Sequence, residues 1–145
     1  MSATRPTTHV AALGLSAIAE LHCVWATGSP WPLSTREALS DQVAGTTSRK
    51  PPSTSACLAV AATLAAAAAL VEGHPRSRPA LARLGSGAVV AVLTLRGGLG
   101  MAGRTDLISP GSTSVAFRSR DRRIYSPLCL TLAALSLPAT VSRRP

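Results

Sequence analysis

The sequence predicts an all-α fold, an integral membrane bundle of four helices, and three observations lead to it. The 145-residue chain is 46% hydrophobic and only 14% charged, whereas soluble domains usually carry roughly 25% charged residues. The apolar residues gather in four runs, and the charged residues lie mainly between those runs. Each run is close to the ~20 residues that a helix needs to cross a bilayer.

We expect one domain over residues 8–141, with short polar tails at 1–7 and 142–145. The predicted membrane-spanning segments are 10–26, 56–71, 84–103 and 127–141. The second and fourth are shorter than the tolerated range of about 17–25 residues, and the second is mostly alanine, so lipid favours its insertion only weakly. A bundle of three spans is therefore the alternative to four.

The first segment could instead be a cleaved signal peptide, with Arg5 as its charged region. Glu20 and His22 follow its apolar core directly, and no clear small-residue cleavage site stands out. These features favour a retained helix.

The three connections differ in composition. The first, 27–55, is rich in proline and glycine and contains a short helical pattern that Ser34 and Glu37 would open as a capping box. The second, 72–83, is a turn of prolines and arginines. The third, 104–126, ends in a run of arginines. With four spans, the first and third connections share one side of the membrane, and both termini lie on the other. The basic residues number eight and six on these two sides, which leaves the orientation open.

The net charge of +9 raises the question of a nucleic-acid partner. The arginines flank apolar segments, and no DNA- or RNA-binding motif is present. We therefore expect a lipid bilayer and no nucleic acid as the partner. A soluble basic protein is the alternative, but too few polar positions interrupt Leu58–Val71 for that segment to fold in water.

The residues needed for metal or enzyme chemistry are scarce. Cys23, Cys57 and Cys129 are far apart in sequence and lie inside apolar runs, so we expect no metal and no cofactor. No His-Glu-x-x-His, P-loop or Gly-x-Ser-x-Gly motif occurs. Whether the protein is an enzyme stays open, although the missing motifs argue against it.

Arg96 is the most unusual residue, because it lies near the middle of the third segment. Its insertion costs roughly 2.5–3.5 kcal/mol, and the Leu and Val residues of the segment return about 2–4 kcal/mol together. The helix therefore needs a partner for Arg96, an aqueous cavity or neighbouring helices.

Glu20, His22 and Arg96 form the candidate intramembrane polar site. Glu20 and Arg96 lie at similar depths in helices that cross in the same direction, so an ion pair is one alternative. The other is that each charge faces a water-filled vestibule separately. His22 lies roughly 200° around the helix from Glu20, so the two cannot share a face. Its simplest role is as a structural hydrogen-bonding residue.

The four aromatic residues, Trp25, Trp31, Phe117 and Tyr125, would all lie on the side of the first and third connections. Trp25, Trp31, Asp121 and Tyr125 form the candidate interfacial face, for which simple membrane anchoring is the alternative explanation. The third segment ends in several glycines, including Gly97, Gly98 and Gly100, which let helices approach closely in lipid.

Two stretches resemble a known family. His22-Cys-Val-Trp-Ala-Thr-Gly-Ser-Pro-Trp-Pro32 closes the first helix, and Asp121-Arg-Arg-Ile-Tyr-Ser-Pro-Leu-Cys129 opens the last. With Leu95-Arg96 and the glycines that follow, they resemble the domain of unknown function family 3995. The resemblance implies a small bacterial membrane protein with four helices, and it assigns no catalytic residue.

We therefore predict a multi-pass protein of the bacterial cell membrane with a small polar binding or permeation site near one face. The alternative is an accessory subunit that docks to a larger membrane partner through its glycine-rich third helix. A homo-oligomer is also compatible with the sequence.

Overall fold

The computed structural model describes residues 4–45, 52–108, 110 and 114–141. These residues form helices and their connections, and none of them lies in a strand. The predicted tail 142–145 and the first part of the tail 1–7 lie outside the described residues.

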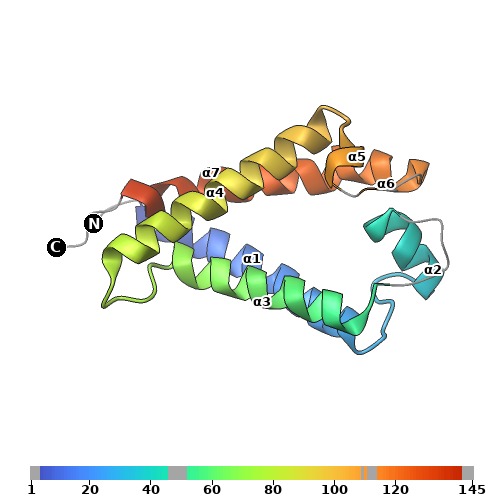
Figure 1. Ribbon diagram of the computed structural model, residues 1–145, viewed down its shortest axis with the longest axis horizontal. Coiled ribbons are helices and arrows are strands. Elements are labelled where there is room, and N and C mark those ends of the chain that lie inside the picture. Colours follow the sequence, from blue (N-terminus) through green and yellow to red (C-terminus); the bar gives the residue numbers. More distant parts are fainter. Residues whose placement is uncertain (1–3, 46–51, 109, 111–113, 142–145) are drawn as a thin grey trace.

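Four long helices run along the molecule (Figure 1). In chain order they are α1 (Thr4–Ala26), α3 (Thr54–Val71), α4 (Pro79–Met101) and α7 (Ser126–Val141). Directly before α7 come the helix α6 (Val115–Arg120) and the π-helical turn η2 (Asp121–Tyr125). These three elements make one fourth helix of 27 residues. All four helices are long and apolar enough to cross a membrane, and the predicted four-helix membrane bundle is confirmed.

The observed helix ends follow local chemistry rather than the limits of the apolar runs. α4 begins at Pro79, ahead of the predicted residue 84, because proline at the first helical position loses no hydrogen bond. The larger difference is at 115–126, which we expected to be a connection. Ser114 caps this helix by accepting a hydrogen bond from the backbone N–H of Phe117 at 3.1 Å. The arginines that follow are good helix formers.

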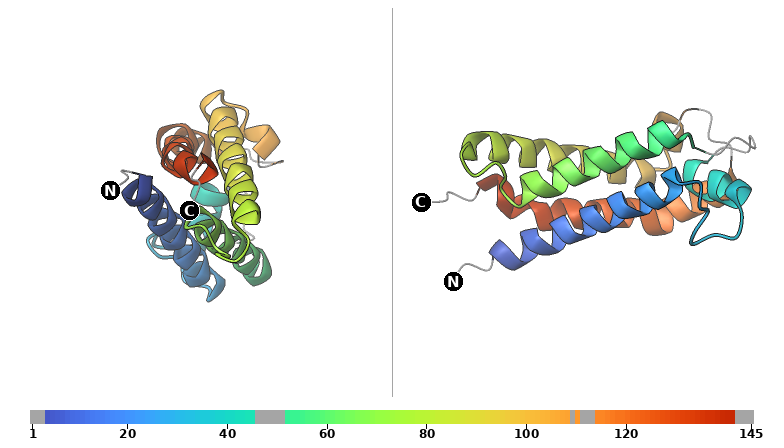
Figure 2. Two further views of the ribbon diagram at one scale, coloured as in Figure 1. Left: turned by 90° about the vertical axis from the view of Figure 1, so that its left-hand side faces the viewer. Right: turned by 90° about the horizontal axis from the view of Figure 1, so that it is seen from below.

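The helices pack as a square. α1 contacts α3 and α7, and α4 contacts α7 and α3, so α1 and α4 lie at opposite corners when the bundle is seen from one end (Figure 2). The α4–α7 and α1–α3 contacts are the most extensive. Any residue pair that requires α1 to touch α4 is therefore disfavoured by this arrangement.

The two ends of the bundle differ. The start of α1, the end of α7 and the turn between α3 and α4 lie at one end, which we call the terminal end (Figure 1). Three short elements lie with α6 at the other, the loop-bearing end: α2 (Arg36–Leu39), η1 (Ser40–Ala44) and α5 (Thr105–Ile108). The first and third connections therefore share one end, as the sequence predicts. Thr35 rather than Ser34 caps α2, and its Oγ1 accepts from the N–H of Ala38 at 3.1 Å.

The apolar core is built largely from small side chains. One buried cluster joins three long helices and consists of Ala11, Ala12 and Leu15 of α1, Ala68 and Val71 of α3, and Leu132 of α7. A second cluster at the loop-bearing end consists of Trp25, Leu39 and Cys57, and it holds α2 against α1 and α3.

Candidate functional site

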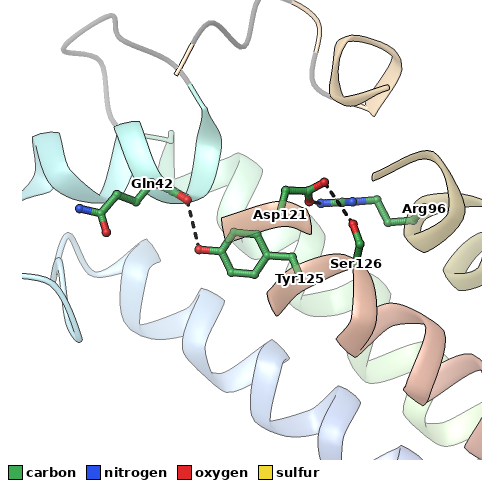
Figure 3. Close-up of polar contacts among 5 residues, drawn as sticks. All are labelled: Gln42, Arg96, Asp121, Tyr125 and Ser126. Atoms are coloured by element: carbon green, nitrogen blue, oxygen red, sulfur yellow. Dashed lines mark hydrogen bonds and ion pairs between the residues drawn. The ribbon is translucent and has the colours of Figure 1, made fainter. Parts of the chain in front are cut away.

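Arg96 and Asp121 form an ion pair between α4 and the fourth helix (Figure 3). The Nη2 group of Arg96 donates a hydrogen bond to Oδ1 of Asp121. The Asp121 side chain is fully buried, and 25% of the Arg96 side chain is exposed. Arg96 lies near the loop-bearing end of α4 (Pro79–Met101) rather than near its middle, and a largely buried charge there needs a partner. Asp121 is the partner that the sequence of the third segment requires for Arg96.

A second hydrogen bond fixes the Asp121 carboxylate. The Oγ of Ser126 donates to Oδ2 of Asp121 at 3.1 Å. In a regular α-helix, residues five positions apart point in directions about 140° apart. The π-helical turn η2 removes this difference, because the N–H of Ser126 bonds to the carbonyl of Asp121. Both side chains therefore reach the inner face of the fourth helix.

Proline follows this turn for a physical reason. Pro127 has no N–H, so it cannot donate to the carbonyl of Arg123 four residues earlier. The α-helical hydrogen-bond ladder is thus interrupted at the place where the π turn inserts its extra residue. The Tyr-Ser-Pro sequence of this block supports the geometry that positions Asp121.

Two glycines of α4 allow the fourth helix to come close. A Cβ atom on Gly100 would collide with Oγ of Ser126 and with the Asp121 carboxylate. A Cβ atom on Gly97 would lie 2.7 Å from Cγ of Leu130. Gly98 faces open space, because nothing lies within 4 Å of a Cβ built there. Gly97 and Gly100 therefore serve packing within this chain, and Gly98 does not.

One nitrogen of the Arg96 guanidinium takes no part in the contact with Asp121. Nη1 is covered by the protein, and it has no hydrogen-bond partner within the described part of the chain. A guanidinium has five N–H donors in a fixed plane. Arg96 thus has donors that the Asp121 contact does not use.

The aromatic residues tie the connections to the helices. The Nε1 of Trp25 donates to the carbonyl of Trp31 at 2.7 Å. The hydroxyl of Tyr125 donates to the carbonyl of Gln42 at 3.1 Å, which joins η2 to η1 (Figure 3). Trp25 is buried, and Trp31 is 63% exposed. Of the candidate interfacial face, Asp121 lies inside the bundle because it neutralises Arg96.

His22 makes local contacts only in the described structure. Its Nδ1 lies 2.8 Å from the carbonyl oxygen of Ile18, one turn earlier in α1. The ring packs edge-on against Trp25, with 4.7 Å between the ring centroids. These contacts are those of a structural hydrogen-bonding residue.

Glu20 and Arg96, both in the described part of the chain, do not form an ion pair. Glu20 is exposed on α1, whereas Arg96 lies on α4 and contacts Asp121. The reason is the square packing, which sets α1 and α4 at opposite corners.

The sequence analysis did not predict Ser126 and Gly100 as neighbours of Asp121, because their alignment depends on a π turn. The Asp-x-x-x-Tyr-Ser-Pro block is the signal that could have indicated them.

The described residues offer no metal site. No group of three or more His, Cys, Asp or Glu side chains in that part of the chain could hold a metal ion. Cys23, Cys57 and Cys129 are free thiols.

The chain matches the model of a known family. The model of the family described as "Protein of unknown function (DUF3995)" matches residues 15–136, a range that contains the Arg96–Asp121 pair and most of the four helices. No curated protein and no solved structure matches the chain. Because the match covers most of its length, the chain belongs to the DUF3995 family of proteins of unknown function.

Proposed function

We propose that this protein is a multi-pass protein of the bacterial cell membrane that binds a small oxyanion near the loop-bearing face. In this proposal, Arg96 recognises the ligand. The observation that supports it most directly is Nη1 of Arg96, a buried donor without a partner in the described part of the chain. An ionisable residue within a membrane helix is, by default, a candidate functional residue.

Arg96 could recognise the oxygen atoms of a carboxylate or a phosphate, since its donors suit planar, bidentate binding. Asp121 would hold the guanidinium in place through Nη2, and Ser126 would hold Asp121. Nη1 is covered, so binding requires a local opening of the loop-bearing end.

The charge of the loop-bearing end favours an anion over a cation. Its exposed arginines outnumber its exposed acidic residues in the described part of the chain. The arginines are Arg36, Arg104, Arg118, Arg120, Arg122 and Arg123. A surface with an excess of one charge raises the local concentration of ligands of the opposite sign.

Glu20 and His22 have secondary places in this proposal. They belong to α1, at the corner opposite α4, and could contribute only to the approach of a ligand. A permeation pathway would have to connect Glu20 with Arg96 across the bundle. Glu20 is exposed on α1 and Arg96 is paired with Asp121, which argues against that version of the site.

The experiment compares the wild type with Arg96→Lys, which keeps the charge opposite Asp121 but removes the planar guanidinium. The melting temperature of the detergent-purified protein is measured with increasing inorganic phosphate and, separately, acetate, each at constant ionic strength. We expect at least one anion to raise the wild-type melting temperature and to leave that of the variant unchanged. An equal rise in both proteins, or none with either anion in the wild type, would contradict the proposal.

The second candidate is an accessory subunit that docks to a larger membrane protein. Two observations favour it: Glu20 is exposed among exposed apolar residues of α1, Leu13 and Val24, and Gly98 of α4 faces open space. A carboxylate facing lipid is costly, and a partner helix could remove that cost. Purification in mild detergent tests this candidate. One stoichiometric partner that is lost in Gly98→Leu would support docking through α4, one that is lost in Glu20→Leu would support docking through α1, and a single-component particle would contradict the candidate.

A further inference from the structure

The fourth helix carries a cluster of exposed arginines at its loop-bearing end. Arg118, Arg120, Arg122 and Arg123 are all exposed, and we call them the basic turn. The carboxylate of this stretch, Asp121, points inward and is neutralised by Arg96. The helix therefore presents cationic side chains outward without an acidic residue of its own among them.

Three members of the basic turn are available to a ligand. Arg120 lies against Tyr125. Arg118, Arg122 and Arg123 form no ion pair within the described structure, where the basic residues paired with a carboxylate are His9, Arg96 and Arg104. Arg118 and Arg122 are four residues apart, so their side chains lie on the same side of the helix. Two guanidinium groups at that spacing can hold one phosphate group.

The length of the fourth helix places the basic turn at the membrane surface. Its 27 residues span about 40 Å at about 1.5 Å per residue, whereas the hydrocarbon core is about 30 Å thick. Exposed apolar side chains continue to the opposite end of the helix, at Leu137 and Val141. The excess length therefore emerges at the loop-bearing end, which is where the arginines are.

Exposed apolar side chains follow the arginines along the fourth helix. Ile124 is 51% exposed and Leu128 is 41% exposed, and both follow Arg123 toward the middle of the helix. The outer surface thus changes from cationic to apolar within about two helical turns. The arginines therefore border the part of the fourth helix whose exposed side chains are apolar, which is where lipid headgroups and acyl chains meet.

We propose that the basic turn binds the phosphate of an anionic phospholipid in the leaflet that meets the loop-bearing end. The ion pair of Arg96 with Asp121 holds the helix in place, so lipid binding costs little conformational entropy of the backbone. Binding uses the outer surface of the fourth helix, and it does not depend on the inner nitrogen of Arg96. The same chemistry would attract a soluble phosphate, but Ile124 and Leu128 favour a lipid.

The experiment uses the full chain in detergent and native mass spectrometry with added dioleoyl phosphatidylglycerol or dioleoyl phosphatidylcholine. The test variant is R118Q/R122Q/R123Q. The matched control is R76Q/R78Q/R83Q, which removes three exposed arginines from the terminal end. Circular dichroism verifies that both variants keep their helices. If the test variant does not fold, R122Q alone replaces it.

We expect the wild type to prefer phosphatidylglycerol. Each juxtamembrane arginine contributes about 1 kcal/mol of attraction to anionic lipid, which corresponds to about fivefold in affinity. The test variant should therefore lose roughly 100-fold in phosphatidylglycerol affinity. R122Q alone should lose about fivefold, and the control should lose clearly less affinity than the test variant.

Three results would overturn the proposal. The first is unchanged phosphatidylglycerol binding in the test variant. The second is an equal loss in the control, which would indicate general attraction between a basic protein and anionic lipid. The third is displacement of the lipid by millimolar glycerol phosphate, which would indicate a site for a soluble phosphate.

Discussion

The two ends of the bundle are held together in different ways. At the terminal end, α1, α3 and α7 meet through apolar residues such as Ala11, Ala68 and Leu132. A polar contact there, between Nδ1 of His9 and Oε1 of Glu72 at 2.7 Å, lies on the surface. At the loop-bearing end, α4 and the fourth helix meet around the fully buried carboxylate of Asp121.

This difference shows which contacts select one arrangement of the helices. Lipid tails are as apolar as the side chains of the terminal end, so burial there yields mainly van der Waals contact. Such contacts tolerate small shifts of one helix along another. The Arg96–Asp121 ion pair has a direction and a single position along α4. It therefore fixes the alignment of α4 with the fourth helix, and we expect substitutions at the two ends to differ accordingly.

The largest effect should come from Asp121→Ala. This change leaves the Arg96 guanidinium largely buried without its counter-ion, and breaking such a pair costs about 3 kcal/mol or more. We expect a loss of that size in the free energy of unfolding, measured by denaturant titration of the detergent-purified protein.

The control for this prediction is the double variant Arg96→Leu/Asp121→Leu. Replacing both charges with apolar residues removes the uncompensated charge, so the double variant should be more stable than Asp121→Ala. A double variant as unstable as the single one would show that local packing, and not charge pairing, explains the loss. That result would remove the basis of the comparison between the two ends.

Much of the fold could be predicted from the sequence because it depends on composition and length. The four apolar runs, the helical class and the grouping of the first and third connections follow from where the charges lie. The fourth helix is longer than predicted. The run from Arg118 to Arg123 is polar and therefore suggested a connection. Arginine is compatible with helix and with a membrane surface, and hydropathy alone does not distinguish these cases.

The candidate site was only partly predictable. Arg96 stood out because a charge interrupts an apolar run, and that signal lies within one segment. Its partner, Asp121, lies 25 residues away in sequence and faces inward at a π turn that α-helical periodicity does not anticipate. Glu20 was the predicted alternative because depth along the helix is readable from sequence. The corner of the bundle that each helix occupies cannot be read from the sequence.

The next largest effect should come from Gly100→Ala. The new methyl group would collide with Ser126 and Asp121, and overpacking of this kind costs about 1–3 kcal/mol. Gly98→Ala is the matched control, since its methyl group meets open space and alanine favours the helix by about 0.8–1.0 kcal/mol over glycine. We expect unfolding titrations to show a loss for the first and no loss for the second. Similar losses in both would mean that helix flexibility, rather than close approach to the fourth helix, explains these glycines.

The smallest effect should come from His9→Gln at the terminal end. The contact of His9 with Glu72 is short, but the two side chains are 63% and 36% exposed, and exposed ion pairs contribute about 0–1 kcal/mol. Distance alone would rank this contact close to the Arg96–Asp121 pair. Burial predicts that its removal changes the free energy of unfolding by less than about 1 kcal/mol, measured in the same titration. A loss as large as that of Asp121→Ala would mean that both ends depend on polar contacts. The proposed contrast between a tolerant end and a fixed end would then be wrong. A small loss of unfolding free energy would show that an ion pair alone does not fix the alignment of the helices. Burial of the carboxylate would then be the property that does.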